Sequence, residues 1–281
     1  MSLRLRWLGT ACFEIILPDK QTIVIDPFVD DAINAPIRSQ QFNVCDYIFI
    51  THGHYDHILD VGKLAERFSP EIFCSDVTAR SLIEVQGVDP GLISRVTPGD
   101  RIQRKGLDVD VIQALHVDFA SEYRRLTGHD LSEHVPVEPM TTVKEALKVM
   151  LGTDQVPERF EEWMTTYPGG EQLNYVFEPD GGKRVYMAGT YPHADIIKAA
   201  EAARAYITLL QVLPGNTVRG MEEQIARLAR ASGCRIAIPQ HHDPLFEGSK
   251  QTDLSELKRL IVDTSEIDFQ ELIPGGWYVF D

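Results

Sequence analysis

The first 26 residues alternate between short apolar runs and turn-forming residues. The apolar runs cover residues 3–8, 12–17 and 22–25, and Gly9-Thr10 and Pro18-Asp19-Lys20 separate them. Runs of this length bounded by glycine, proline and aspartate are typical of strands. We therefore predict an antiparallel meander at the start of the chain.

The next hundred residues mix continuous apolar runs with one helical stripe. Tyr47-Ile48-Phe49-Ile50 is apolar throughout, which suits a strand buried on both faces. Val61, Leu64, Ala65 and Phe68 fall at helical spacing and would face a sheet. The same reasoning predicts strands or extended segments at 72–74, 94–97 and 107–115, and a helix at 75–86.

The strand pattern stops between residues 117 and 172. Thr142-x-x-Glu145 is a capping box that predicts the start of a helix, and residues 157–165 predict a second one. We interpret residues 117–172 as a helical insertion that could act as a lid.

Strands and helices alternate in the last third of the chain. Pro179-Asp180-Gly181-Gly182 predicts a hairpin between strands at 174–177 and 184–187. Helices follow at 196–203, 218–230 and 254–261, with strands at 206–213, 235–238 and 277–280. Strands with helical crossovers in both halves predict an α/β fold with two sheets, in a single domain over residues 1–281.

Composition and charge limit the kinds of binding partner that the chain can have. Lys and Arg total 27 against 42 acidic residues, a net charge of −15. A nucleic-acid or anionic-membrane surface is therefore not expected, whereas a small-molecule substrate, even an anionic one, is compatible with the chain. Neither a secretory signal nor an apolar run of about 18 residues is found, so we expect a cytoplasmic protein. The scattered Cys12, Cys45, Cys74 and Cys234 are expected to be free thiols.

Candidate chemistry is concentrated directly after the buried strand at 47–50. His52, His54, Asp56 and His57 form the pattern His-x-His-x-Asp-His. In an extended segment His52 and His54 point the same way and can hold one metal ion, while Asp56 and His57 reach a second position nearby. Gly53 removes a side chain where the loop must pass close to the metals.

Two further histidines follow predicted strands and complete the candidate ligand set. His116 follows the strand at 107–115, and His241 follows the strand beginning at residue 235. Loops at strand ends are where an α/β scaffold gathers ligands from distant parts of the chain. The remaining histidines favour other roles: His242 in support of the site or of the fold, His193 with Asp195 at a helix start, and His129 and His134 in solvent.

A pair of divalent ions at this site predicts hydrolysis. Such ions lower the pKa of bound water from 15.7 toward about 7, so a metal-bound hydroxide can attack a small ester, lactone or phosphoester. Asp56 can hold a metal and also orient the hydroxide, which makes it the candidate catalytic residue. The chain has no Gly-x-Ser-x-Gly elbow and no phosphate-binding glycine loop. Serine catalysis and nucleotide triphosphate chemistry therefore have no support in the sequence.

Several motifs in this order resemble the metallo-β-lactamase superfamily, most closely its ascorbate-6-phosphate-lactonase-like hydrolases. The resemblance implies an αββα four-layer sandwich with metals in a groove along one edge of the sheets. It also implies that His52, His54 and His116 surround one ion and that Asp56, His57 and His241 surround the other. The motifs are Trp7-Leu8-Gly9-Thr10-Ala11-Cys12-Phe13, Ile25-Asp26-Pro27-Phe28, the segment from Asp46 to His57, Pro98-Gly99-Asp100, His116 and Ile238-Pro239-Gln240-His241.

One departure from the family pattern concerns the aspartate that usually bridges the metals, where this chain has Thr190 after Gly189. The resemblance still implies two zinc or manganese ions, with a one-metal state as the alternative. Asp26 stands where the family has a carboxylate that supports the ligands; a turn cap is the alternative. An iron-dependent redox enzyme and a non-catalytic metal-binding member remain alternative functions. Substrate and oligomeric state, including a homo-oligomer, stay open.

Overall fold

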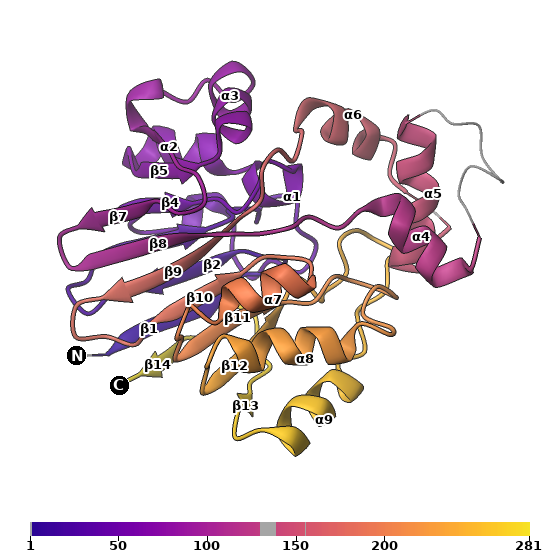
Figure 1. Ribbon diagram of the computed structural model, residues 1–281. Coiled ribbons are helices and arrows are strands. Elements are labelled where there is room, and N and C mark those ends of the chain that lie inside the picture. The colour runs from indigo at the N-terminus through magenta and orange to yellow at the C-terminus, as the bar shows by residue number, and fades with distance from the viewer. Residues whose placement is uncertain (1, 130–138, 155) are drawn as a thin grey trace.

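Two seven-stranded sheets form the centre of the protein (Figure 1). The structure is a computed structural model and describes residues 2–129, 139–154 and 156–281. The first sheet has the order β14-β1-β2-β3-β4-β5-β6. Neighbours from β14 to β3 run antiparallel, and those from β3 to β6 run parallel. Its strands are β1 Leu3–Trp7, β2 Phe13–Ile16, β3 Thr22–Ile25, β4 Tyr47–Phe49, β5 Glu71–Cys74, β6 Ile93–Arg95 and β14 Tyr278–Phe280.

The second sheet has the order β13-β12-β11-β10-β9-β8-β7. It is antiparallel from β7 to β10 and parallel from β10 to β13. The predicted N-terminal meander and the hairpin after residue 177 are therefore confirmed. The strands are β7 Arg101–Arg104, β8 Leu107–Gln113, β9 Leu173–Pro179, β10 Val185–Ala188, β11 Ile207–Gln211, β12 Ile236–Gln240 and β13 Asp268–Phe269.

Alternate residues of both sheets meet in a shared apolar core. Phe49 of β4 and Phe177 of β9 have ring centroids 4.9 Å apart, edge to face. The Tyr175 hydroxyl donates to the Ile50 carbonyl oxygen across the sandwich at 2.7 Å. This bond fixes the end of β4 against the second sheet, immediately before the candidate ligands begin.

Helices cover the outer face of each sheet, which confirms the predicted αββα arrangement. Apolar side chains of the first three helices pack on the first sheet, and those of the last three pack on the second. The helices on the first sheet are α1 Tyr55–Ile58, α2 Val61–Phe68 and α3 Asp76–Glu84, and those on the second are α7 Ala194–Ala200, α8 Glu222–Ala231 and α9 Ser255–Thr264. Two 3-10 helices lie at Ser39–Gln41 and Pro90–Leu92.

In the described part of the segment 117–172 there are three helices, which lie together beyond one end of the sheets (Figure 1). They are α4 Phe119–Thr127, α5 Pro139–Leu151 and α6 Arg159–Thr166. The sequence pattern missed α4. It also placed the start of α5 wrongly, because the helix begins at Pro139 and Thr142 lies inside it. A proline is well suited to a first helical turn, where its missing N–H costs nothing.

Other differences are confined to the ends and edges of the sheets. The edge strands β7 and β13 were not predicted, β8 ends at Gln113, and α8 begins at Glu222. Short edge strands bury little surface, so they leave a weak apolar pattern. The four cysteines are buried free thiols, as predicted. Among the described residues, no helix is long and apolar enough to cross a membrane.

Candidate metal centre

The His-x-His-x-Asp-His segment leaves the first sheet at the end of β4 and turns into α1. His54 is extended, with φ −66° and ψ 152°, and it is the N-cap of α1, which carries Asp56 and His57. The predicted local conformation is therefore present. Gly53 has a different neighbour from the one expected, since a Cβ at this position would lie 2.5 Å from the Pro168 carbonyl oxygen. The returning end of the insertion therefore requires glycine here.

His116 leaves the end of β8 and is held through the backbone of the preceding residue. The Leu115 N–H donates to Thr190 Oγ1 at 2.9 Å, and the Tyr191 N–H donates to the Leu115 carbonyl oxygen at 2.7 Å. The His116 ring nitrogen Nδ1 lies 2.8 Å from the Val117 carbonyl oxygen. With Nδ1–H donating to that carbonyl, the Nε2 lone pair is available to a metal.

His241 follows β12 in a backbone conformation that is uncommon outside glycine, with φ +62°. Two contacts with the β1–β2 turn hold it there. The His241 N–H donates to the Thr10 carbonyl oxygen at 2.8 Å, and the Asp243 carboxylate accepts from the Thr10 N–H at 3.0 and 3.1 Å. The Gly9-Thr10 turn of the N-terminal motif thus positions a ligand more than 200 residues away in the chain.

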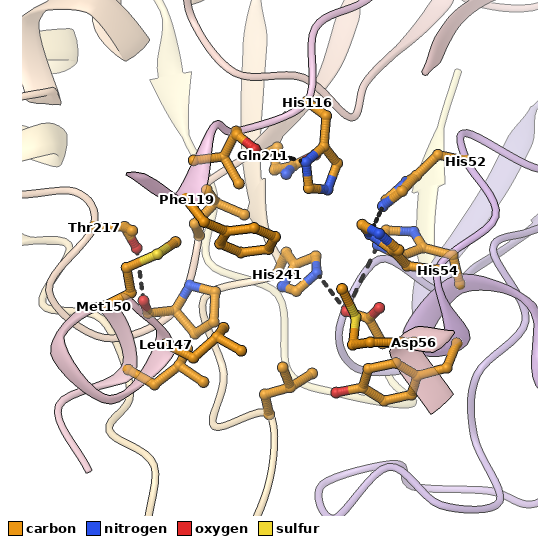
Figure 2. Close-up of a pocket in the computed structure, with 18 of the residues that line it drawn as sticks. His52, His54, Asp56, His116, Phe119, Leu147, Met150, Gln211, Thr217 and His241 are labelled. Carbon is orange, nitrogen blue, oxygen red and sulfur yellow. Dashed lines mark hydrogen bonds and ion pairs between the residues drawn. The ribbon is translucent and has the colours of Figure 1, made fainter. Parts of the chain in front are cut away.

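The structure brings all six candidate residues together in two groups of three (Figure 2). In each group, one possible ligand atom per residue can be chosen so that all three lie within 4.8 Å of one another. The first group is His52, His54 and His116, and the second is Asp56, His57 and His241. The ring centroids of His52 and His57, one from each group, are 4.0 Å apart, so the two groups adjoin.

Burial leaves the first group neutral. Burial, together with neighbouring histidines, lowers the pKa of His52 well below the usual value and that of His54 to about 3. Burial also lowers the pKa of His116. Neutral imidazoles bind metals, whereas protonated ones cannot. At neutral pH the first group therefore offers three imidazoles that are ready to bind an ion.

The second group contains the only carboxylate of the six. Asp56 Oδ2 lies 3.2 Å from His241 Nε2 and 3.8 Å from His57 Nε2. Burial on its own would raise the pKa of Asp56, but the nearby His57 and His241 outweigh it and the pKa is lowered. Asp56 is thus ionised at neutral pH and points its charge at the nitrogens of its own group.

Asp26 supports His57 from behind. The Asp26 side chain accepts from the Thr51 N–H at 2.7 Å and from Thr51 Oγ1 at 2.6 Å, and its Oδ2 lies 2.8 Å from His57 Nδ1. Burial would lower the pKa of His57, but Asp26 and Asp56 outweigh it and raise the pKa. Of the two roles left open for Asp26, the geometry matches support of a candidate ligand. Its carboxylate accepts from the Nδ1–H of His57, which leaves Nε2 of that ring facing Asp56.

The donor set fits divalent metal ions. Five imidazoles and one carboxylate converge, and the histidines of the first group are neutral. Imidazole ligands suit zinc and iron, whereas manganese prefers more oxygen donors. The two groups are thus chemically able to hold a metal, and the two-by-three division is the one implied by the family resemblance.

The other candidate polar residues lie outside both groups. Thr190 is buried with its hydroxyl on the Leu115 backbone, so it supports His116 and does not stand in for a bridging carboxylate. His193 is the exposed N-cap of α7, and it accepts from the Asp195 N–H. His242 stacks on Trp7 at 4.8 Å. His129 is exposed, and His134 lies outside the described residues.

A cavity opens beside the six residues, with about 60 Å³ of free space. Helices α4, α5 and α6 supply much of its wall, so the insertion shapes the space next to the candidate metal ligands. Figure 2 shows Phe119, Leu147 and Met150 on one side of the cavity and the imidazoles with Asp56 on the other.

Two residues at the site were missed from the sequence. Asp243 could have been noticed, because it is an acidic residue two positions after a candidate ligand. Its role could not be predicted, because its partner Thr10 is far away in the chain. Gln211 at the end of β11 lines the cavity, and a single glutamine carries no motif. Only the pairing of β11 with β10 and β12 places it beside the histidines.

Comparisons with known proteins agree with this geometry. A model of the metallo-beta-lactamase superfamily matches residues 5–196. A UPF0173 metal-dependent hydrolase from Koribacter versatilis is 39% identical over 276 residues, covering 97% of this chain and 96% of the relative.

Solved structures share the fold at low identity. Igni18, a metallo hydrolase from Ignicoccus hospitalis, superimposes with a TM-score of 0.69 at 18% identity and covers 100% of this chain and 99% of that one. CmlA, a diiron beta-hydroxylase from Streptomyces venezuelae, has a TM-score of 0.58 at 12% identity over 99% of this chain and 54% of that one. At these identities the likeness concerns the fold alone.

Proposed function

Because the chain belongs to the metallo-beta-lactamase superfamily and to its UPF0173 metal-dependent hydrolases, we propose that it hydrolyses a small-molecule ester, lactone or phosphoester at the six-residue cluster. The observation that carries the proposal is the convergence of His52, His54, His116, Asp56, His57 and His241 into two adjoining groups of potential ligands. The closer resemblance to lactonase-like members supports a lactone and stays a prediction.

The two groups would each hold one divalent ion, and the imidazole-rich donor set favours zinc. When bound, such ions lower the pKa of a water molecule toward neutrality and polarise the oxygen of the bond to be cleaved. The protein's own contribution is to keep the imidazoles of the first group neutral through burial and to fix the orientation of the candidate ligands. Asp26, Thr10 and the Leu115 backbone do this for one ligand each.

Asp56 is the proposed catalytic residue. Its lowered pKa keeps it a carboxylate at neutral pH. An ionised carboxylate in the cavity wall can accept a hydrogen bond from the attacking water and orient its lone pair toward the substrate. The apolar wall opposite excludes bulk water, so this interaction is less screened there than in solvent.

Metal analysis joined to a substrate panel tests the proposal. Purified protein is expected to bind zinc and to hydrolyse a member of a panel of esters, lactones and phosphodiesters. His116→Ala and His241→Ala should each remove metal from one group, whereas the exposed His193→Ala serves as a matched control with unchanged metal content. Asp56→Asn should lower turnover by about 100-fold or more, in the range typical of acid–base groups. Protein that takes up no metal would end the proposal.

Iron chemistry is the second candidate, because imidazoles and a carboxylate also suit iron. The fold shared with a diiron hydroxylase is its support. Iron in the protein as isolated, together with oxygen consumption, would favour it over hydrolysis. Metal-loaded protein that hydrolyses nothing would favour a non-catalytic member.

A further inference from the structure

We propose that the substrate is an uncharged carboxylic ester or lactone whose acyl portion is apolar, and that the insertion selects it. This inference rests on the proposed function and narrows the substrate class. The insertion would exclude substrates that carry a phosphate or carboxylate away from the bond being cleaved.

The side of the cavity away from the metal centre is almost wholly apolar. Its side chains come from the segment just before α4, from helices α4, α5 and α6, and from the loops after β11 and β12. They are Val117, Phe119, Leu147, Met150, Leu151, Phe160, Met164, Leu213, Pro214 and Leu245. A substrate bound at the six-residue cluster must place its remaining atoms against this wall, and burial of each apolar methylene there contributes roughly 0.8 kcal/mol.

Among the described residues, no lysine or arginine lines the cavity. The basic residues of the insertion are occupied elsewhere. Arg125 pairs with the buried Glu122 and donates to the Thr217 carbonyl oxygen, and Lys148 pairs with Glu145. Metal ions at the cluster can neutralise charge at the reacting group, but a second anionic group against the apolar wall would be buried without a partner. Burial of an unpaired charge is strongly unfavourable.

The polar atoms in the wall suit a neutral partner. The Thr217 hydroxyl is already used, since it donates to the Pro214 carbonyl oxygen at 2.7 Å. The Gln211 side-chain oxygen is buried and has no hydrogen-bond partner among the described residues. That oxygen can accept from a neutral hydroxyl or N–H of a ligand, and the amide provides no full positive charge to offset an anion.

Calorimetry with hydrolysis-resistant lactams tests the selection without relying on turnover. One probe is a δ-lactam with a propyl side chain, and its matched counterpart ends that chain in a carboxylate. Zinc-loaded protein is expected to bind the propyl lactam at least ten times more tightly. Equal or tighter binding of the carboxylate form would overturn the inference. The corresponding lactones, used as substrates, should show the same order of kcat/KM.

A charge placed in the wall should reverse the preference. Met164 is half-buried on α6 and lines the cavity, so Met164→Lys introduces an ammonium group while its alkyl chain still packs. It should bring the two lactams within threefold of each other or favour the carboxylate. Thr165→Lys, exposed on the same helix, is the control and should keep the parent preference. A preference in Met164→Lys equal to that of the parent would refute the role of the wall.

Two features keep the outcome informative. Leu213→Lys places the same charge on the opposite element, after β11, should Met164→Lys fail to fold. Failure of the proposed function appears differently from failure of this inference, since the former leaves the parent without metal uptake or hydrolysis. An active, metal-binding parent that prefers the charged substrate contradicts only the substrate class.

Discussion

Replacement of Asp26 by asparagine tests how the second group is held. Asp26 is fully buried and holds the Nδ1 proton of His57 through Oδ2 at 2.8 Å. In Asp26→Asn one oxygen can still accept from the Thr51 N–H, but an amide N–H then faces His57 Nδ1. That contact favours the tautomer with its proton on Nε2, the nitrogen that faces Asp56 and would bind a metal. The substitution therefore keeps the side-chain shape and replaces the hydrogen-bond acceptor that faces His57 Nδ1 with a donor.

The size of the expected loss in metal affinity can be estimated from other residues that orient metal ligands. Loss of a residue that orients a metal ligand lowers metal affinity by about 10- to 100-fold, or about 1.4 to 2.8 kcal/mol. The loss should fall mainly on the group of Asp56, His57 and His241, because Asp26 contacts His57 directly and reaches His52 of the other group only through Thr51 Oγ1. Affinity at His52, His54 and His116 should change by less than about threefold.

Competition against a chromophoric chelator measures both zinc affinities. Asp46→Asn is the matched control, because Asp46 also accepts from a backbone N–H in the first sheet, that of Thr22 at 2.8 Å, and lies away from the cluster. Zinc affinities in Asp26→Asn that match those of the parent, or an equal loss in the control, would show that Asp26 does not set the His57 tautomer.

Three further predictions follow from neighbouring contacts. Thr190→Val removes the acceptor of the Leu115 N–H, so urea unfolding should show a loss of about 1 to 3 kcal/mol together with weaker metal binding at His116. Asp243→Ala frees the Thr10 N–H and the strained His241 backbone, and should lower both stability and affinity of the second group in the same assays. In metal-free protein, the lowered pKa values of His52 and His54 mean that unfolding takes up protons below about pH 6.5. Stability should fall from pH 6.5 toward 3, by up to about 1.4 kcal/mol per pH unit for each histidine. His57, whose pKa is raised, opposes this trend, since its contribution is complete below about pH 6.5 and is lost above. Urea titrations in EDTA at several pH values check the sign, and a flat profile would contradict it.

Much of the fold could be predicted because its central strands are strongly patterned. β3, β4 and the strands between β9 and β12 are buried on both faces, so their apolar runs are continuous and the flanking turns are clear. The edge strands β7 and β13 carry exposed residues and no such run. Helix α4 was missed because its surface is mostly polar, and among its described residues only Glu122 is fully buried.

The candidate ligands could be predicted because each one follows a recognisable strand, whereas the residues that support them could not. Thr10 with Asp243, and Thr190 with Leu115, are joined across 233 and 75 positions of the chain. Such contacts depend on the stacking of the two sheets, which no local pattern encodes. The resemblance to the metallo-β-lactamase superfamily is confirmed, while the role of the insertion as a lid stays a prediction.

Charge balance connects the missing bridge with the supports of the second group. Two divalent ions would carry four positive charges, and among the six candidate ligands only Asp56 is negative, because the first group is made of neutral imidazoles. With threonine at position 190, carboxylates behind the candidate ligands can supply part of the remaining compensation, beside a metal-bound hydroxide. Asp26 and Asp243 are both buried there, and both support histidines of the second group. A centre without the bridging carboxylate therefore has two buried acids behind the histidines of its second group.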